Sequence, residues 1–292
     1  MALDRPLTLP EGLASDPRML AFRGDIAAEH LKGKVSADRF VAGRPMQVRA
    51  GSAALRKAPD AMAEQVNQAL FGEGFTVYDE AGGWAWGQLA ADNYVGWMRA
   101  DELGPPVVAT HRVKVLRSFI FPRPDMKSPP MLAVSMNARL ALGEVLNGFA
   151  QVEGSGWIFA RHASPVAEFE KDFVGVAERF VGSPYLWGGR ESAGIDCSGL
   201  VQVSLQATGR SVLRDSDMQE QTLGEKLEAD ASFSGLKRGD LIFWRGHVGM
   251  MCDSVRLLHA SARDLHVEIE PLAEAVARIR PIAGEVRSVR RL

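Results

Sequence analysis

One of the two cysteines in the 292-residue sequence lies where a thiol can act as a nucleophile. Cys197 follows the glycine-rich run Trp187-Gly188-Gly189 and begins a stretch of helical character. A thiol at a helix N-terminus faces unpaired backbone N–H groups and the positive end of the helix dipole, and both favour its thiolate form. We therefore predict that Cys197 is a catalytic nucleophile.

Two histidines further along the chain could supply the base that a cysteine nucleophile needs. His247 begins the predicted strand HVGMM, and His259 lies in the predicted strand RLLHAS. If these strands are antiparallel neighbours, the two imidazoles lie side by side, and His259 fixes the tautomer of His247 through a hydrogen bond. We expect Cys197 and His247 to form a thiolate–imidazolium pair that His259 orients.

The segments that carry these residues resemble a known family. The pieces PYLWGG, DCSGLVQ, RGDLIFW, HVGMM and LLHASA, in this order, are similar to the NlpC/p60 family of papain-like cysteine peptidases, which cut peptidoglycan peptides. The resemblance puts the nucleophile on Cys197, the general base on His247 and the third, orienting residue on His259. It implies an α+β papain-like catalytic domain over residues 166–292.

The rest of that domain must position the three residues. Apolar side chains at helical spacing predict a helix over residues 166–180, and the nucleophile begins a second helix over 197–208. A short helix near 214–219, three strands within 239–261 and a last helix over 272–279 follow. A helix that carries the nucleophile and packs on an antiparallel sheet that carries the imidazoles is the expected layout.

The first half of the chain consists of short alternating runs bounded by Gly, Asp, Asn or Pro, which is typical of small all-β barrels. We predict two of them in tandem, over residues 43–104 and 105–165, after an N-terminal segment of loops and one short helix (25–31) in residues 1–42. Both barrels resemble the bacterial SH3-like domains that precede the catalytic domain in one branch of the same family.

The resemblance of the first barrel also implies substrate-binding residues. The matching pieces are LFGE, which ends in Glu73, and DNYVGW, which contains Tyr94. In that branch of the family, the two residues would contact the α-amino group of an N-terminal L-alanine. Periodicity alone favours the alternative in which Glu73 is a solvated turn residue and Tyr94 a packed barrel aromatic, and the resemblance reverses that preference.

Asp196 has two candidate roles, because a carboxylate beside the thiol would raise the thiol pKa and oppose its activation. One role is to cap the N-terminus of the helix that begins at Cys197. The resemblance adds a second role, in which Asp196, Ser198 and Tyr185 bind the ammonium of the first substrate residue. An anionic clamp of Glu73 and Asp196 would accept a free amine and reject an acylated one.

On this resemblance the protein is a cysteine endopeptidase that hydrolyses the bond between γ-D-glutamate and a diamino acid. The implied substrate is L-alanyl-γ-D-glutamyl-meso-diaminopimelate or its L-lysine version, and the implied process is murein peptide recycling. The backbone N–H of Cys197, with the Tyr185 hydroxyl as a second candidate donor, would stabilise the oxyanion. Two other interpretations remain: an acyltransferase on the same Cys–His scaffold, and a non-catalytic module that binds cell wall.

Composition limits the partners. Lys and Arg total 34 against 36 for Asp and Glu, so no basic excess attracts nucleic acid or an anionic membrane. The prolines and charges of residues 1–10 do not fit a secretory signal, and no stretch is long and apolar enough for a membrane span. We expect a cytoplasmic monomer without metal or other cofactor, in which Cys252 is a core thiol.

Overall fold

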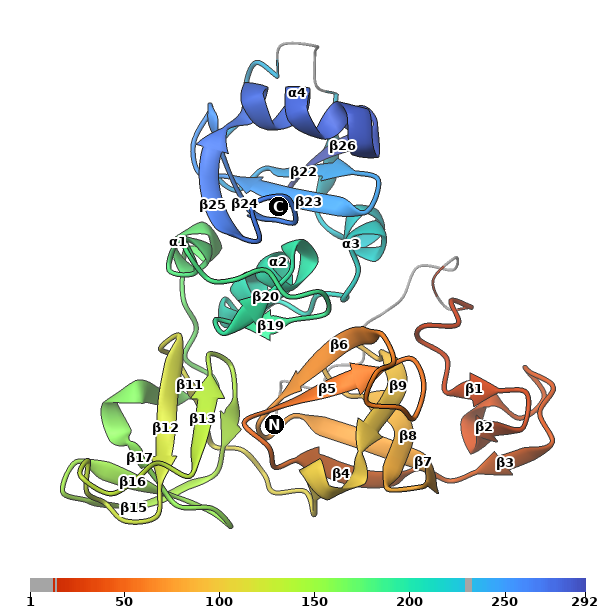
Figure 1. Cartoon of the computed structure of the whole chain (residues 1–292), viewed down its shortest axis with the longest axis vertical. Helices are drawn as coiled ribbons and strands as arrows, with labels where there is room; N and C mark the ends of the chain where they lie inside the picture. The colour runs from red at the N-terminus through yellow and green to blue at the C-terminus, as the bar shows by residue number, and fades with distance from the viewer. Residues whose placement is uncertain (1–12, 14, 229–232) are drawn as a thin grey trace. The chain divides into compact units, whose positions relative to one another are not determined.

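The computed structural model describes residue 13, residues 15–228 and residues 233–292, so residues 1–10, where we expect no secretory signal, lie outside the described part. The chain divides into two compact units, Met1–Glu168 and Phe169–Leu292 (Figure 1). The first is built almost wholly from strands, and the second combines one sheet with four helices among its described residues. None of the described helices is long and apolar enough to cross a membrane.

A small sheet opens the first unit. The antiparallel pair β1 (Phe22–Arg23) and β2 (Ile26–Ala28) is joined by β3 (Arg39–Val41), which runs parallel to β2. The helix predicted over residues 25–31 is wrong, because only a single 3-10 turn, Glu29–Leu31, forms there. The side chains of β2 are fully buried, and Ile26 and Ala28 belong to a cluster with three tryptophans, so tertiary packing overrides the local helical pattern.

Residues 44–104 form the strands expected of the first predicted barrel. Seven antiparallel strands form one sheet, in which β4 (Arg44–Val48) and β7 (Gly74–Ala81) are neighbours. The full order is β10 (Leu103–Gly104), β4, β7, β8 (Trp84–Leu89), β9 (Val95–Arg99), β5 (Ser52–Arg56) and β6 (Gln65–Leu70). Inward residues such as Leu55, Phe75 and Met98 are almost fully buried, as the alternating pattern requires.

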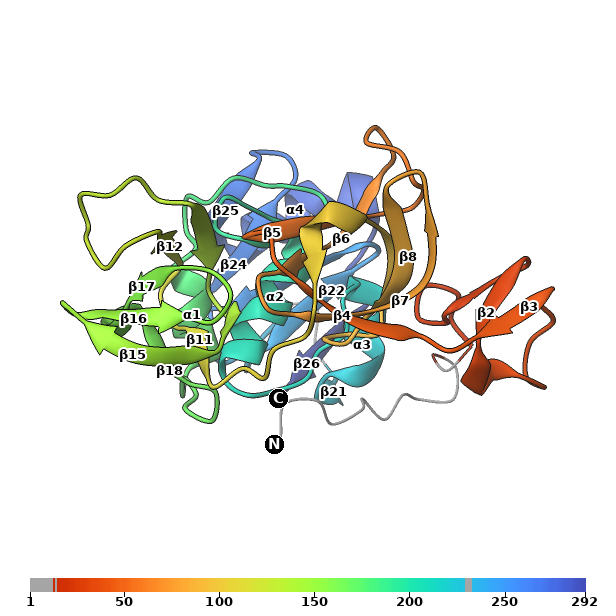
Figure 2. The same cartoon turned by 90° about the horizontal axis from the view of Figure 1, so that it is seen from below.

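The following strands form two further sheets around one core. The larger has the order β13 (Leu132–Ser135), β12 (Arg117–Phe121), β17 (Trp157–Phe159), β16 (Phe149–Val152) and β15 (Leu142–Leu146), and Figure 2 shows its last three strands side by side. The smaller joins β14 (Arg139–Leu140), β11 (His111–Val113) and β18 (Ala163–Pro165). Val113, Ile120 and Ile158 are buried in the core that these sheets share.

The second unit is a six-stranded antiparallel sheet between helices. Its order is β21 (Glu225–Leu227), β26 (Ser288–Arg291), β22 (Leu241–Trp244), β23 (His247–Met251), β24 (Arg256–Ser261) and β25 (His266–Pro271). Helix α4 (Leu272–Ala283) covers one face through a buried apolar cluster, and α2 (Cys197–Ala207) packs against β23 and β24 (Figure 1). This is the arrangement expected of a helix that carries the nucleophile.

The helix predicted over residues 166–180 is wrong in extent. Helix α1 runs only from Phe173 to Glu178 and begins after Asp172, whose carboxylate accepts a hydrogen bond from the Val174 N–H at 3.0 Å. Upstream, β18 pairs with β11, and the Val166 N–H extends this pairing to the Thr110 carbonyl. The backbone of that segment is therefore committed to strand pairing before a helix can start.

Candidate active site

The thiol of Cys197 lies at the start of α2, where the sequence predicted it. Asp196 is the N-cap, and its Oδ1 accepts a hydrogen bond from the Gly199 N–H at 2.7 Å. The helix approaches the preceding glycine-rich turn so closely that a Cβ on Gly199 would collide with the carbonyl of Gly189. This close approach explains why glycine is required at position 199, in the first turn of the helix.

The sulfur of Cys197 reaches the strand that carries His247. The backbone N–H of Val248, the residue that follows that histidine, acts on the sulfur and lowers the pKa of the thiol. The register between β23 and β24 covers Met250–Leu258 and Met251–Leu257, so His247 and Val248 precede the paired part. The nucleophile therefore sits beside the end of the sheet where the strands β23 and β24 separate.

The two imidazoles lie side by side, which confirms the arrangement predicted from the two strands. His247 Nε2 is 2.9 Å from His259 Nδ1, and the rings meet edge to face at 5.1 Å between centroids. His259 is buried, whereas His247 is half-buried and has its ring centroid 5.6 Å from that of Trp244. His259 is thus in position to orient His247.

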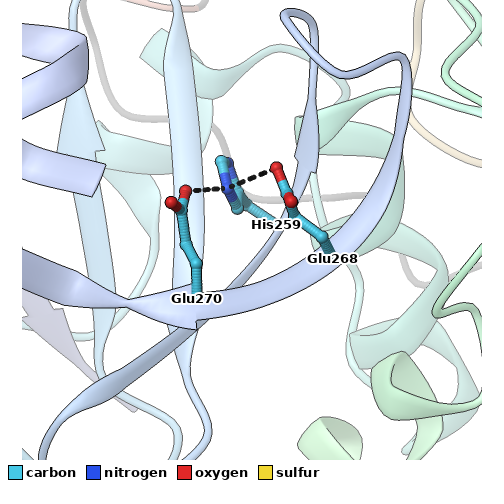
Figure 3. A group of neighbouring side chains, drawn as sticks. All are labelled: His259, Glu268 and Glu270. Atoms are coloured by element: carbon cyan, nitrogen blue, oxygen red, sulfur yellow. Dashed lines mark hydrogen bonds and ion pairs between the residues drawn. The ribbon is translucent and has the colours of Figure 1, made fainter. Parts of the chain in front are cut away.

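A carboxylate that the sequence analysis missed completes this row of groups. Glu270 Oε1 on β25 lies 2.8 Å from His259 Nε2 (Figure 3). An ionised carboxylate can only accept, so His259 carries its proton on Nε2 and presents the lone pair of Nδ1 to His247. His247 must then donate from Nε2, which leaves its Nδ1 unprotonated and free to act as the base.

Glu270 has the charge needed for this role. Burial opposes its ionisation, but hydrogen bonds and charge interactions with His259 and Arg278 outweigh burial and hold the pKa of Glu270 below its usual value. Arg278 on α4 donates to the same oxygen, Oε1, that accepts from His259. Arg278 on α4 and His259 on β24 therefore hold the Glu270 carboxylate from two sides.

His259, Glu268 and Glu270 also form a group that could in principle hold a cation, because their ligand atoms lie within 4.8 Å of one another. Figure 3 shows the imidazole of His259 between the two carboxylates. However, His259 Nε2 faces Glu270 at hydrogen-bonding distance, and Glu270 is already paired with Arg278. These contacts fit a hydrogen-bonded chain that fixes which nitrogen of each histidine is protonated, and they fit a metal centre less well.

The charge states differ from those expected for the nucleophile and base. Burial, with a further contribution from Asp196, raises the pKa of the Cys197 thiol to about 12. Burial, followed by the electrostatic effects of His259 and Arg278, lowers the pKa of His247 to about 3. Both directions favour a neutral thiol and a neutral imidazole in the resting site over the expected thiolate–imidazolium pair, because desolvation opposes the helix dipole.

Asp196 confirms its predicted capping role and has a partner that the sequence did not reveal. Its carboxylate forms a buried ion pair with Arg214, with 2.6 Å between Oδ2 and Nη2, and Arg214 also donates to Oδ1 at 2.9 Å. The Gly188 N–H donates to Oδ2 at 2.8 Å, and Ser198 Oγ lies 3.3 Å from Oδ1. The charge of Asp196 is thus compensated within the protein.

The other predicted binding residues of this unit lie around the same centre. Ser198 Oγ accepts a hydrogen bond from Arg214 at 2.8 Å and is buried. Burial, followed by the charges of Cys197 and Asp196, raises the pKa of Tyr185 far above its usual value. The Tyr185 hydroxyl therefore stays protonated and can donate a hydrogen bond.

The two predicted residues of the first barrel are both buried. Glu73 is 4% exposed in the turn between β6 and β7, and its Oε2 accepts from the Leu70 N–H at 2.9 Å. Tyr94 is 5% exposed, and its backbone N–H donates to Asp92 Oδ1 at 3.1 Å. The alternative in which Glu73 is a solvated turn residue is therefore wrong.

Comparison with known proteins identifies both parts of the chain. Residues 182–282 match the NlpC/P60 family, and residues 55–103 match the bacterial dipeptidyl-peptidase Sh3 domain. The first match contains Cys197, His247 and His259, and the second contains Glu73 and Tyr94.

Similar curated proteins extend over most of the chain. A γ-D-glutamyl-L-lysine dipeptidyl-peptidase of Bacillus cereus is 30% identical over 242 residues, which cover 70% of this chain and 70% of the relative. Its namesake from Bacillus subtilis is 28% identical over 234 residues, covering 72% and 76%. A crystal structure of an NlpC/P60 family protein from B. cereus shares the fold, with a TM-score of 0.71 at 22% identity over 85% of this chain and 99% of that one. The chain belongs to the NlpC/P60 family of cysteine peptidases, with an SH3 domain ahead of its catalytic domain.

Proposed function

We propose that this protein hydrolyses the bond between γ-D-glutamate and the diamino acid in peptidoglycan stem peptides that have a free N-terminal L-alanine. The observation that carries the proposal is the row of hydrogen-bonded side chains His247, His259 and Glu270, with the Cys197 thiol near the backbone of Val248, the residue after His247. The names of the curated relatives support the choice of bond.

The geometry suggests how the groups would work. His247 Nδ1 takes the proton of the Cys197 thiol as the sulfur attacks the γ-glutamyl carbonyl, so the ion pair forms during the attack. The oxyanion accepts hydrogen bonds from the backbone N–H of Cys197 and the hydroxyl of Tyr185. His247 then gives its proton to the leaving amine as the C–N bond breaks. Water, deprotonated by the same histidine, finally hydrolyses the thioester.

Glu270 would stabilise the charged state of His247 indirectly, through His259. A neutral third residue can hold a tautomer but compensates little of the imidazolium charge. Here His259 donates to an ionised carboxylate, so the positive charge that develops on His247 lies next to an imidazole polarised by Glu270.

Selection for a free amine is the second part of the proposal. On the family resemblance, we assign the recognition of the substrate's L-alanine ammonium to Glu73 and Tyr94 of the first unit and to Tyr185, Asp196 and Ser198 of the second. Because Arg214 compensates Asp196, the net negative charge of this clamp would come from Glu73. A free peptide would then be favoured over intact cell wall, in which that amine is acylated.

The proposal also includes the domain boundaries, the oligomeric state and the cellular location of the protein. We assign residues 1–42 to an N-terminal segment, 43–104 and 105–165 to two SH3-like barrels and 166–292 to a papain-like catalytic domain. The two sheets around the second buried core, and the packing of α2 on β23 and β24, support this assignment. Since one chain supplies every catalytic group, we propose a monomer that recycles murein peptides in the cytoplasm, where a reducing medium keeps Cys197 free.

Digestion of two matched peptides tests this function. The substrates are L-Ala-γ-D-Glu-meso-diaminopimelate and the same peptide with its alanine N-acylated, and the products are read by mass spectrometry. The parent protein should cut only the free peptide, at the γ-D-glutamyl bond, and Cys197→Ala should abolish cleavage. Cys252→Ala, which removes the other buried thiol, should remain active. Addition of a second amine should give no transfer product, whereas an acyltransferase would form one.

A further inference from the structure

A cavity of about 210 Å³ opens on the side of the two catalytic imidazoles. His247 and His259 form one wall. The turn between β22 and β23, the turn after β24 and the last turns of α4 form the others, together with the exposed ring of Trp187. Tyr185 also lines this cavity whereas Cys197 does not, so the space borders the base and not the nucleophile.

The lining of the cavity is cationic. Arg245, Arg263 and Arg278 come from its three surrounding elements, and no lining residue is acidic. Arg278 is the partner of Glu270, whose carboxylate also serves His259. The other two guanidinium groups have their charge largely uncompensated. Arg263 lies 3.8 Å from Asp264 and is 62% exposed, and Arg245 has no ion pair with any residue that the structure describes.

The chemistry determines which part of a substrate enters this space. His247 must hand its proton to the nitrogen of the leaving amine, so the leaving fragment lies on the imidazole side of the scissile bond. The cavity begins at that imidazole. It is therefore placed to receive the diamino acid, while the γ-glutamyl part lies on the side of Cys197.

We propose that this cavity binds the side chain of the leaving diamino acid and that its arginines select one that ends in a carboxylate. This inference rests on the proposed function and chooses between its two substrates. The side chain of meso-diaminopimelate ends in an ammonium and a carboxylate, whereas that of L-lysine ends in an ammonium alone. Arg245 and Arg263 can bind the carboxylate through charge-assisted hydrogen bonds, and both repel an uncompensated ammonium.

Paired tripeptides measure this preference. L-Ala-γ-D-Glu-meso-diaminopimelate and L-Ala-γ-D-Glu-L-Lys differ in that carboxylate, and the observable is the ratio of their kcat/KM values. We expect the parent protein to favour the diaminopimelate peptide by about tenfold or more. Arg245→Gln and Arg263→Gln should each lower the ratio, and the double variant should bring it to within about threefold of unity. Both arginines are exposed, so neither change disturbs the core.

Arg210→Gln is the matched control, because Arg210 is an exposed arginine just beyond the C-terminal end of α2, opposite the end that carries Cys197. It should leave the ratio unchanged. Equal cleavage of both tripeptides by the parent, or an unchanged ratio in the double variant, would overturn the inference while the proposed function stands. Cleavage of neither peptide would instead overturn the proposed function itself.

Discussion

Glu270 contacts His259 diagonally across two antiparallel strands. The register places His259 opposite Glu268, yet Glu268 Oε1 is 3.8 Å from His259 Nε2, whereas Glu270 Oε1, two residues further along β25, is 2.8 Å away. Arg278 on α4 forms an ion pair with the Glu270 carboxylate and holds it in this position. The row of catalytic groups thus ends on a carboxylate that is fixed from two directions.

Glu270→Gln tests whether the charge of this carboxylate matters. The amide can still accept the hydrogen bond from His259, but it no longer compensates positive charge that develops on the imidazoles. We expect kcat to fall about tenfold with little change in KM, because the loss is felt only in the transition state. Steady-state kinetics on the free tripeptide measures both constants.

Glu268→Gln is the control for that change, since Glu268 is the other carboxylate near His259 but makes no hydrogen bond to it. It should retain most of the activity. Equal losses in the two variants would show that the local negative charge matters without the specific contact between Glu270 and His259.

The acid limb of the pH profile should lie unusually low. Burial disfavours the protonated form of His247 and lowers its pKa to about 3, so the base stays available well below the usual imidazole range. We expect kcat/KM, which reports the free enzyme, to be retained down to about pH 5 and to fall only below it. An acid limb near the ordinary histidine pKa, about 6.5, would contradict the burial argument.

The neutral resting pair has a second measurable consequence. Because burial raises the pKa of Cys197 to about 12, the parent protein should show no thiolate absorbance in the ultraviolet at neutral pH beyond that of Cys197→Ala. Alkylation of Cys197 should accelerate as the pH rises through the alkaline range. Thiolate absorbance that persists at neutral pH would restore the ion pair expected from the helix N-terminus.

Much of the catalytic architecture could be predicted from the sequence, because it depends on local signals. The cysteine at a helix start and the two histidines on strands follow from residue type and spacing, and the structure brings the imidazoles into contact. Glu270 could not be assigned in this way. HVEIEP does show two acids on one face of a strand, but which of them reaches His259 depends on the pairing register and on Arg278 in the next helix.

Long-range pairing also explains where the sequence analysis failed. The apolar spacing near Val166 looks helical, yet its backbone pairs with Thr110, a partner that no local pattern reveals. Arg214 likewise meets Asp196 from a separate loop. Its burial became evident only in the folded chain, where its side chain is 1% exposed.

Arg214 should be essential for stability because it compensates a buried charge. Arg214→Met would leave the Asp196 carboxylate without its cationic partner, and breaking a buried pair in this way costs about 3–5 kcal/mol. Urea unfolding should show that loss, and Asp196→Asn added to Arg214→Met should recover part of it. The exposed Arg256, paired with Asp253, provides the control, since Arg256→Gln should leave the unfolding midpoint unchanged.

The amine clamp is tested most directly at Glu73. Glu73→Gln keeps an oxygen that can accept a hydrogen bond from the Leu70 N–H. It removes the negative charge that we propose binds the substrate ammonium. We expect kcat/KM for the free tripeptide to fall about tenfold or more, with no loss on the N-acylated peptide, so that discrimination between the two decreases. Glu80→Gln changes an exposed glutamate on β7 of the same barrel and should leave discrimination intact. Thermal unfolding of both variants separates a change in specificity from a loss of fold. Discrimination that survives Glu73→Gln in a folded protein would show that the free amine is recognised by other groups.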